Sequence, residues 1–394
     1  MLRPVACSTN KSGDLTRGNV VADKPNMRKP FVERSSNPDR RANLPVHESK
    51  LIGYYSVDGD RKFLSNASKM KYYNPSAEMK VYADLSRGVH MDLDEGLDVA
   101  VRRDVSFLDE GISMLLEWIK LNHKRIRAPP ETGRWIQPKF VCTRGTLETL
   151  LRFSRSPKDT WVLYAARWKG TIYLTTDKSL KKTAFSDPRQ TRFGSWGHKF
   201  EQYVLSKSPD ELPDTTEPVI EAEEFRCVYQ RNIGGHSVIY CSIMKGLLSN
   251  KPLKEPLPLH LLKFVEVRTN RIIEFGPQEI NFNRFKTLQW WAQCFLTNTK
   301  HVLCGFRDDA GIVHKLTIYD LEKIIELGRP YWKAGNCVNS CKSVLTKIEE
   351  TVVRDCDQNI YSFERIPNGQ INTSELPASS EHAFLPTSFF EASG

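Results

Sequence analysis

Hydrophobic and polar residues follow regular patterns along most of the chain after residue 50. Alternation between the two kinds predicts strands, because successive side chains of a strand point to opposite faces. Lys169-Gly170 and Gly234-Gly235 each separate two alternating runs, which predicts a hairpin turn at each dipeptide. The strands expected from alternation cover residues 51–57, 161–167, 171–175, 225–231, 237–245, 264–269, 301–306, 311–319, 360–365 and 383–390.

Apolar residues three or four positions apart predict helices between these strands. The first is expected over residues 106–124, where it ends in basic residues and is stopped by Pro129-Pro130. Further helices are expected over residues 146–153, around Glu201, and over residues 281–296 and 337–353. Strands and helices in this order predict an α/β (mixed α+β) fold.

The first 49 residues differ from the remainder, because they are polar and have no sustained periodicity. They carry nearly twice as many Lys and Arg as Asp and Glu, so we expect a disordered basic arm. A nucleic-acid or partner arm, an import signal around Arg40-Arg41 and a solvated tail all fit this composition. Residues 50–394 are expected to form a single domain. A turn or short edge strand is expected at Asp84 to Gly88.

Charge and cysteine content restrict the class of partner and the compartment. The net charge of +10 and the pI near 9.0 favour a polyanionic partner, of which nucleic acid is the commonest. The nine cysteines are scattered without the spacing of a zinc site, which favours free thiols in a reducing compartment. No apolar run approaches ~18 residues and no apolar leader opens the chain, so neither a membrane span nor a secretory signal is expected.

The strand expected at residues 264–269 carries the first candidate chemistry. Glu266 and Arg268 lie two residues apart and therefore on one face. In nucleases such a carboxylate holds a divalent metal, and the cation contacts the phosphate or the nucleophile. An exposed salt bridge is the ordinary alternative for an isolated pair of this kind.

Together with other motifs, this pair resembles the DXO family of RNA 5′-end enzymes, which remove aberrant caps and degrade RNA 5′→3′. The family pattern is an Arg, then G-x-h-x-E, E-h-D and E-h-K, where h is apolar. Its residues correspond here to Arg144, to Gly197 through Glu201 with Lys199 at the apolar position, and to Glu266-Val267-Arg268. The resemblance implies a PD-(D/E)xK nuclease-like core with mixed β-sheets flanked by helices.

The E-h-D element departs from the family pattern. Ile243 and Lys245 stand where its Glu and Asp are expected, and residues 227–254 contain no acidic residue. A unit charge ~4 Å from another is worth roughly 4 kcal/mol at an effective dielectric of ~20, so an ammonium there opposes metal entry. We therefore expect the Mg²⁺ or Mn²⁺ of the family to be lost and no cofactor to be needed. The expected protein is a pseudo-enzyme whose degenerate site comprises Glu201, Ile243, Lys245, Glu266 and Arg268.

The resemblance also implies RNA-binding residues and partners. Basic and amide side chains map to the place where the family grips the RNA 5′ end, and phosphate contacts there need no metal. These residues are Arg144, Arg167, Lys199, Lys245, Arg268, Lys286 and Gln293. Similarity to a degenerate nuclear branch of the family further implies protein partners in a Rhino–Deadlock-type complex on chromatin. There the protein would protect piRNA precursor transcripts from termination, splicing and decay.

Two other functions stay open at this point. The protein is an active metal-dependent decapping enzyme or 5′→3′ exoribonuclease if a further ligand comes from the acidic segment containing Glu221, Glu223 and Glu224. It is a scaffold for protein partners, without RNA binding, if Lys245 and Arg268 close the cleft by salt bridges to the two glutamates.

Overall fold

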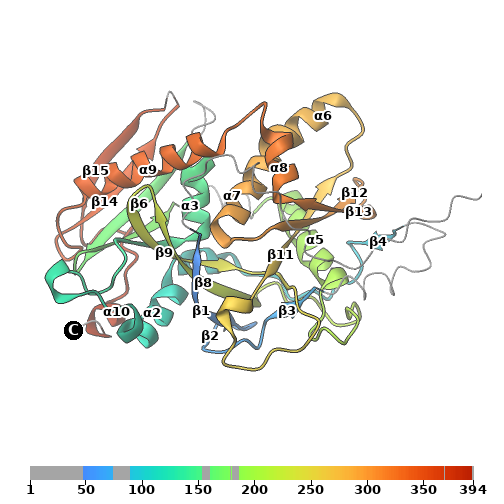
Figure 1. The fold of residues 1–394 in the computed structure, drawn as a ribbon, viewed down its shortest axis with the longest axis horizontal. Helices are drawn as coiled ribbons and strands as arrows, with labels where there is room; N and C mark the ends of the chain where they lie inside the picture. Colours follow the sequence, from blue (N-terminus) through green and yellow to red (C-terminus); the bar gives the residue numbers. More distant parts are fainter. Residues whose placement is uncertain are drawn as a thin grey trace, which may run out of the picture. The chain divides into compact units, whose positions relative to one another are not determined.

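A computed structural model of the chain describes residues 48–73, 89–152, 160–177, 179, 186–367 and 369–392. Residues 1–47 of the predicted basic arm lie outside the described residues, as does the turn expected at Asp84 to Gly88. Two mixed sheets with helices against them form the described part of the chain (Figure 1). The expected mixture of strands and helices is confirmed.

The larger sheet has nine strands within the described ranges. Its middle strand, β5, leads directly into Arg144, a residue of the candidate site. β5 runs parallel to both of its neighbours, whereas the remaining pairs are antiparallel. In sheet order the strands are β15 (Ile371–Pro377), β14 (Asn359–Arg365), β6 (Trp161–Trp168), β7 (Thr171–Thr176), β5 (Phe140–Thr143), β9 (His236–Ile243), β8 (Glu224–Ile233), β1 (Lys50–Val57) and β2 (Phe63–Leu64).

The smaller sheet receives the chain directly from the larger one. β9 ends at Ile243 and β10 begins at Gly246, so only Met244 and Lys245 connect the two sheets. At the centre of this sheet β11 and β12 are parallel, with Glu266 opposite Val302. Its strands within the described residues are, in order, β3 (Lys71–Tyr72), β10 (Gly246–Leu247), β11 (Phe264–Arg271), β12 (His301–Arg307), β13 (Ile312–Asp320) and β4 (Met91–Asp92).

Helices cover both faces of the larger sheet, and α5 packs on the smaller one. Alternate residues of β5 enter different cores: Phe140 and Cys142 lie in the core with α3, α7 and α9, and Val141 lies in the core with α2 and α10. The helical segments are η3 (Val105–Glu110), α2 (Ser113–Ile126), η4 (Pro130–Thr132), α3 (Arg144–Arg152), α5 (Pro188–Val204), η6 (Leu259–Leu261), α6 (Gly276–Asn281), the π-turn η7 (Phe282–Lys286), α7 (Thr287–Thr297), α8 (Leu321–Gly328), α9 (Ala334–Thr351) and α10 (Thr387–Ala392).

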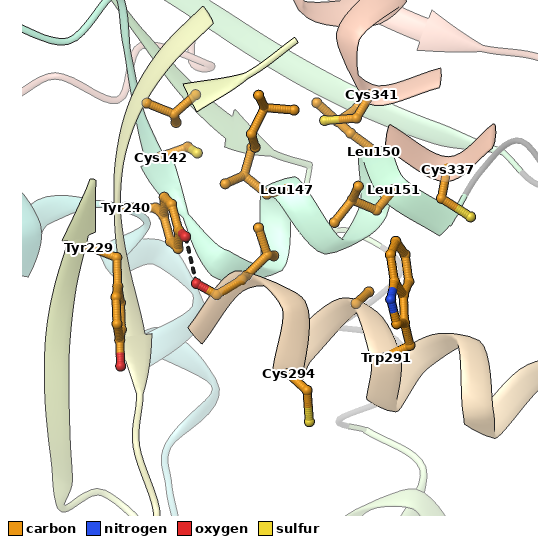
Figure 2. Packing of buried hydrophobic residues seen from close by; sticks show 14 of the residues in the cluster. Cys142, Leu147, Leu150, Leu151, Tyr229, Tyr240, Trp291, Cys294, Cys337 and Cys341 are labelled. Atoms are coloured by element: carbon orange, nitrogen blue, oxygen red, sulfur yellow. Dashed lines mark hydrogen bonds between the residues drawn. The ribbon is translucent and has the colours of Figure 1, made fainter. Parts of the chain in front are cut away.

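The core around α3 fixes the position of the candidate site. Leu147, Leu150 and Leu151 of α3 are fully buried between α7 and α9 (Figure 2). Burying an aliphatic side chain of this size stabilises the fold by ~1.5–3 kcal/mol, so α3 is firmly held on the sheet. The Tyr240 hydroxyl donates to the Leu296 carbonyl, 2.5 Å away, and so ties β9 to the end of α7.

The cysteines of the described residues are free and buried, and several lie in this same core. Burial raises the pKa of the Cys341 thiol to about 12, so it stays protonated. This agrees with the expectation of free thiols. None of the helices in the described ranges combines the length and the apolar character that crossing a membrane requires.

Three expectations about elements need correction. Gly111, with φ of 54°, separates a 3₁₀ turn from α2, so the first helix begins at Ser113 instead of residue 106. The helix expected over 281–296 is extended backwards by α6 and a π-turn. The strand expected over 383–390 is wrong: α10 begins just after Pro386, and Phe389 packs on Trp135 and Tyr173, while β15 pairs with β14 instead.

Candidate functional site

Glu266 of β11 is the centre of a buried ionic group. Its side chain accepts from Arg144, whose Nη1 lies 3.2 Å from Oε1, and from the guanidinium of Arg268 on the same strand. Arg268 also donates to Gln293 Oε1, with Nη2 2.8 Å away, and Gln293 donates onward to Glu148 at 3.1 Å. This Glu266 group therefore links β11, α7 and the first turns of α3. Burial lowers the pKa of Arg144, but Glu266 and then Glu148 raise it above its ordinary value.

Glu201 of α5 forms a second ion pair with Lys245, and the Nζ–Oε1 distance is 2.6 Å. Burial raises the pKa of Glu201, but the Lys245 ammonium and then His198 lower it below its usual range. Burial lowers the pKa of His198 to about 4; Glu201 opposes this shift, whereas Lys245 adds to it. The pair is thus a carboxylate facing an ammonium, with a neutral imidazole beside it.

Ile243 and Lys286 complete the set of predicted residues near these groups. Ile243 lines a cavity of about 270 Å³ together with Arg144, and Lys245 follows it by two residues. Burial lowers the pKa of the Lys286 ammonium, and so does the positive charge of Arg268. Lys286 therefore stands close enough to the Glu266 group to experience its charge.

Two predicted RNA-binding residues lie elsewhere. Lys199 lies on a different face of α5 from Glu201, and its side chain is buried there. Its Nζ lies 3.4 Å from the Thr215 carbonyl and 4.0 Å from Glu95. Arg167, at the end of β6, donates to the Val353 carbonyl and lies 3.6 Å from Asp355. Neither residue contacts the Glu266 group or the Glu201–Lys245 pair, because each already has partners on another element.

The acidic segment that could supply a further ligand is engaged in other contacts. Glu221 accepts from the Ser195 hydroxyl, and Glu223 pairs with Lys69. Glu224 is the most enclosed of the three, because guanidinium groups contact both of its oxygens.

Three arginines around Glu224 are not among the residues predicted from sequence, namely Arg61, Arg103 and Arg226. Burial raises the pKa of Glu224, but Arg226, Arg103 and Arg61 together lower it to about 2. Glu224 and Arg226 lie two apart on β8, the same spacing as Glu266 and Arg268, and this repetition was a signal that could have been read. The other two arginines come from distant segments, which no local pattern reveals.

The carboxylates do not fit a divalent metal in this arrangement. Mg²⁺ and Mn²⁺ take several oxygen ligands, whereas Glu201 and Glu266 each contact a cationic side chain instead. In the part of the chain that the structure describes, no three His, Cys, Asp or Glu side chains form a group that could hold a metal ion. No metal-dependent step is therefore assigned to these residues, and the loss of the family's metal stays a prediction.

Known proteins resemble this chain over most of its length. The family model for "RAI1 like PD-(D/E)XK nuclease" matches residues 47–390. The human "Decapping and exoribonuclease protein" is 27% identical over 347 residues, which cover 86% of this chain and 84% of the relative. The "Decapping and exoribonuclease protein Rai1" of Drosophila melanogaster is 26% identical and covers 77% of this chain and 82% of the relative.

Solved structures show the same fold. Rai1 of Scheffersomyces stipitis superposes with a TM-score of 0.72 at 19% identity, covering 88% of this chain and 96% of that one. Rai1 of Candida albicans, solved in complex with pU5-Mn²⁺, has the same TM-score at 18% identity and covers 88% of this chain and 94% of that one. The predicted PD-(D/E)xK nuclease-like core is confirmed.

The comparisons correct the prediction that the protein is not an enzyme. That prediction relied on Ile243 and Lys245 in place of the E-h-D carboxylates. The relatives that match most of the chain are named decapping and exoribonuclease proteins or decapping nucleases, which contradicts it. A change in one motif element does not by itself show that catalysis is lost.

Three observations point to the same family. They are the match over nearly the whole chain, the shared fold, and the contacts among the motif residues Arg144, Glu201, Glu266 and Arg268. The chain belongs to the RAI1-like PD-(D/E)XK nuclease family.

Proposed function

We propose that this protein acts on the 5′ ends of RNA, with decapping or 5′→3′ exoribonuclease activity. The observation that carries the proposal is the convergence of Arg144 and Arg268 on Glu266, with Arg144 also lining a cavity, in a chain that matches the family over residues 47–390. The names of the relatives and the RNA complex of one family structure support it further.

The residues of this chain suit the binding of an RNA end. Arg144 and Arg268 are both held at Glu266, so their guanidinium groups are positioned to donate to phosphate oxygens. Gln293 fixes the orientation of Arg268 through two hydrogen bonds, of 2.8 and 3.2 Å. A preorganised cation loses little conformational entropy when it binds a phosphate, which favours both affinity and correct placement.

The test is a time course with 5′-monophosphate RNA and, in parallel, capped RNA, in Mg²⁺, Mn²⁺ or EDTA. We expect shortened or uncapped RNA that is lost in Glu201→Gln and Glu266→Gln. Glu375→Gln is the matched control. Glu375 lies on β15, is half-exposed and pairs with Arg354. Intact RNA in every metal, from protein with a normal thermal unfolding curve, would overturn the proposed activity.

We also propose that the protein works in the nucleus and with protein partners. The basic composition of residues 1–49, with Arg40-Arg41, supports this location, and the resemblance to a nuclear branch of the family supports the partners. Action on piRNA precursor transcripts in a Rhino–Deadlock-type complex stays a prediction from that resemblance. A fluorescent fusion tests the location: we expect nuclear accumulation that is lost without residues 1–49, and a full-length fusion outside the nucleus would contradict it.

A further inference from the structure

Basic side chains gather at the C-terminal end of α2, on the face of the larger sheet that α10 also covers (Figure 1). Residues 117–136 carry five Lys and Arg against two carboxylates, Glu117 and Glu131. Glu117 is already paired, since Lys120 Nζ lies 2.6 Å from its Oε1. The four remaining cations, Lys124, Arg125, Arg127 and Arg134, form what we call the α2-end surface.

The charges of the α2-end surface are not balanced by nearby carboxylates. Three of its side chains are exposed and that of Arg134 is half-buried. Among the described residues, no carboxylate oxygen lies within 4.0 Å of any of the four. Arg125 is held by neutral acceptors, the Asn122 side chain at 3.0 Å and the Ile52 carbonyl at 3.1 Å. A polyanion therefore finds cationic donors here that no internal ion pair has to release.

The helix dipole accounts for only part of this surface. Cations in the last turn of a helix are favoured by its negative end, which suits Lys124 and Arg125. Arg127 follows the last residue of α2, and Arg134 belongs to the loop after η4. The dipole does not explain why these two positions are basic as well.

Backbone contacts join this loop to the turn between β6 and β7. The Trp135 N–H donates to the Lys169 carbonyl at 3.1 Å. Gly170 permits the close approach, because a Cβ there would lie 2.7 Å from a carbonyl oxygen of the loop. Lys169 thus lies next to the α2-end surface, whereas the charge of Arg167 is offset by Asp355, 3.6 Å away. A surface fixed in this way loses little conformational entropy when it binds a ligand.

α2 connects the α2-end surface to the cavity that Arg144 lines. Gly111, just before α2, belongs to the lining of that cavity, whereas the surface lies around the last residue of the helix, Ile126. α2 has 14 residues, so at ~1.5 Å per residue the two places are about 21 Å apart along the helix. Stacked nucleotides advance ~3.4 Å each along a strand, so about six of them cover this distance.

We propose that the α2-end surface binds the phosphate backbone of single-stranded RNA, about six nucleotides from an end held at the cavity. Lys and Arg side chains contact phosphate oxygens without reading the bases, so the surface adds affinity for long RNA of any sequence. The inference rests on the proposed function and deepens it, because it names a second contact with the same substrate outside the candidate site.

The test compares the affinities of a twenty-nucleotide RNA and a trinucleotide, both with a 5′-monophosphate, in EDTA so that the RNA stays intact. A stacked trinucleotide covers ~10 Å and does not reach the surface. We expect Lys124→Gln/Arg127→Gln to bind the long RNA about tenfold more weakly and the trinucleotide as the native chain does. For the long RNA, the slope of log Kd against log salt should fall by ~1.4, since each contact with a single strand contributes ~0.7.

Lys251→Gln/Lys254→Gln is the matched control. Both lysines are exposed between β10 and η6, so this variant loses the same charge from another part of the chain. We expect it to keep the native difference between the two RNAs. If it weakens the long RNA as much as Lys124→Gln/Arg127→Gln does, net charge explains the effect and the inference is wrong.

Further outcomes would overturn the inference. Equal affinities of the native chain for both RNAs, or a Lys124→Gln/Arg127→Gln variant that keeps the native difference, would exclude the surface. Equal weakening of both RNAs would show that the change acts through the cleft or the fold. Competition by polyglutamate as effective as by RNA would assign the surface to an acidic protein segment. If the variant fails to fold, Arg134→Gln/Lys169→Gln takes its place, because it leaves α2 unchanged.

The two proposals fail separately. RNA cleavage by a protein whose affinity does not depend on RNA length would remove only the α2-end surface. A length dependence that requires Lys124 and Arg127, in a protein that leaves all RNA intact in Mg²⁺ and Mn²⁺, would keep the surface and remove the nuclease activity.

Discussion

Single residues of the site are defined by the charges that face them. His198 lies one helical turn before Glu201 on α5, and Lys245 completes the Glu201 pair from the end of β9. Burial keeps the imidazole neutral, so the Glu201 carboxylate is balanced chiefly by Lys245, with a smaller effect of Lys71. The protonation of one histidine is thereby linked to the stability of the whole fold.

This linkage predicts a specific dependence of stability on pH. The pKa of His198 is lowered from 6.5 to about 4, so between these values the unfolded chain binds a proton that the folded chain excludes. Stability is therefore fully present above pH 6.5 and falls as the pH drops toward 4. Glu201, Lys245, Arg103 and Glu221 face His198, and the lowered pKa of Glu201 acts in the same direction at still lower pH.

Urea unfolding at pH 7.5, 5.5 and 4.5 measures the effect. The native chain should lose stability more steeply than His198→Gln, whereas His260→Gln, which changes an exposed histidine, should follow the native chain. Parallel curves for the native chain and His198→Gln would contradict the prediction.

At the scale of elements, the end of α7 is tied to the start of β1 by one residue. Asn298 has φ of 54°, in the left-handed region, and its N–H donates to the Cys294 carbonyl to close the helix. Its side chain accepts from the Ser49 N–H at 3.1 Å and donates to the Ser49 carbonyl at 2.5 Å. Because α7 also carries Gln293, this tie helps to hold a helix that positions Arg268.

We expect Asn298→Ala to cost about 3–4 kcal/mol of unfolding free energy. The left-handed backbone accounts for ~1–2 kcal/mol and the two hydrogen bonds for ~1 kcal/mol each. Asn298→Gly keeps the backbone conformation and should lose only the hydrogen-bond part. Chemical denaturation of both variants distinguishes these contributions, and equal losses would show that backbone strain plays no part.

Elements were predicted well where one local pattern decides them. Alternation is enough for β6, β7 and the turn at Lys169-Gly170, because both turn residues adopt positive φ and the flanking strands are buried. The segment around Phe389 failed, since its aromatic pattern fits a strand equally well, and only packing against Trp135 and Tyr173 makes a short helix of it.

At the scale of the whole molecule, the site could be predicted only in part. The motifs brought Arg144, Glu201, Glu266 and Arg268 to notice, since each lies in a short recognisable stretch. The arginines that contact Glu224 come from segments as far apart as Arg61 and Arg226. They meet because β1 pairs with β8. Lys199 shows the opposite error: its place in the motif is adjacent to the site, but its position on α5 turns the side chain away.

The short passage between the two sheets has a consequence for the charge of the site. Met244 is 3% exposed and belongs to the core, whereas its neighbours Ile243 and Lys245 are partly exposed, with the Lys245 side chain at 13%. A change at 243 therefore disturbs the core less than a change at Met244, whereas a change at 245 also removes the partner of the Glu201 carboxylate. Met244 thus anchors the passage in the core while the two flanking positions face the site, and Lys245 sets the charge there.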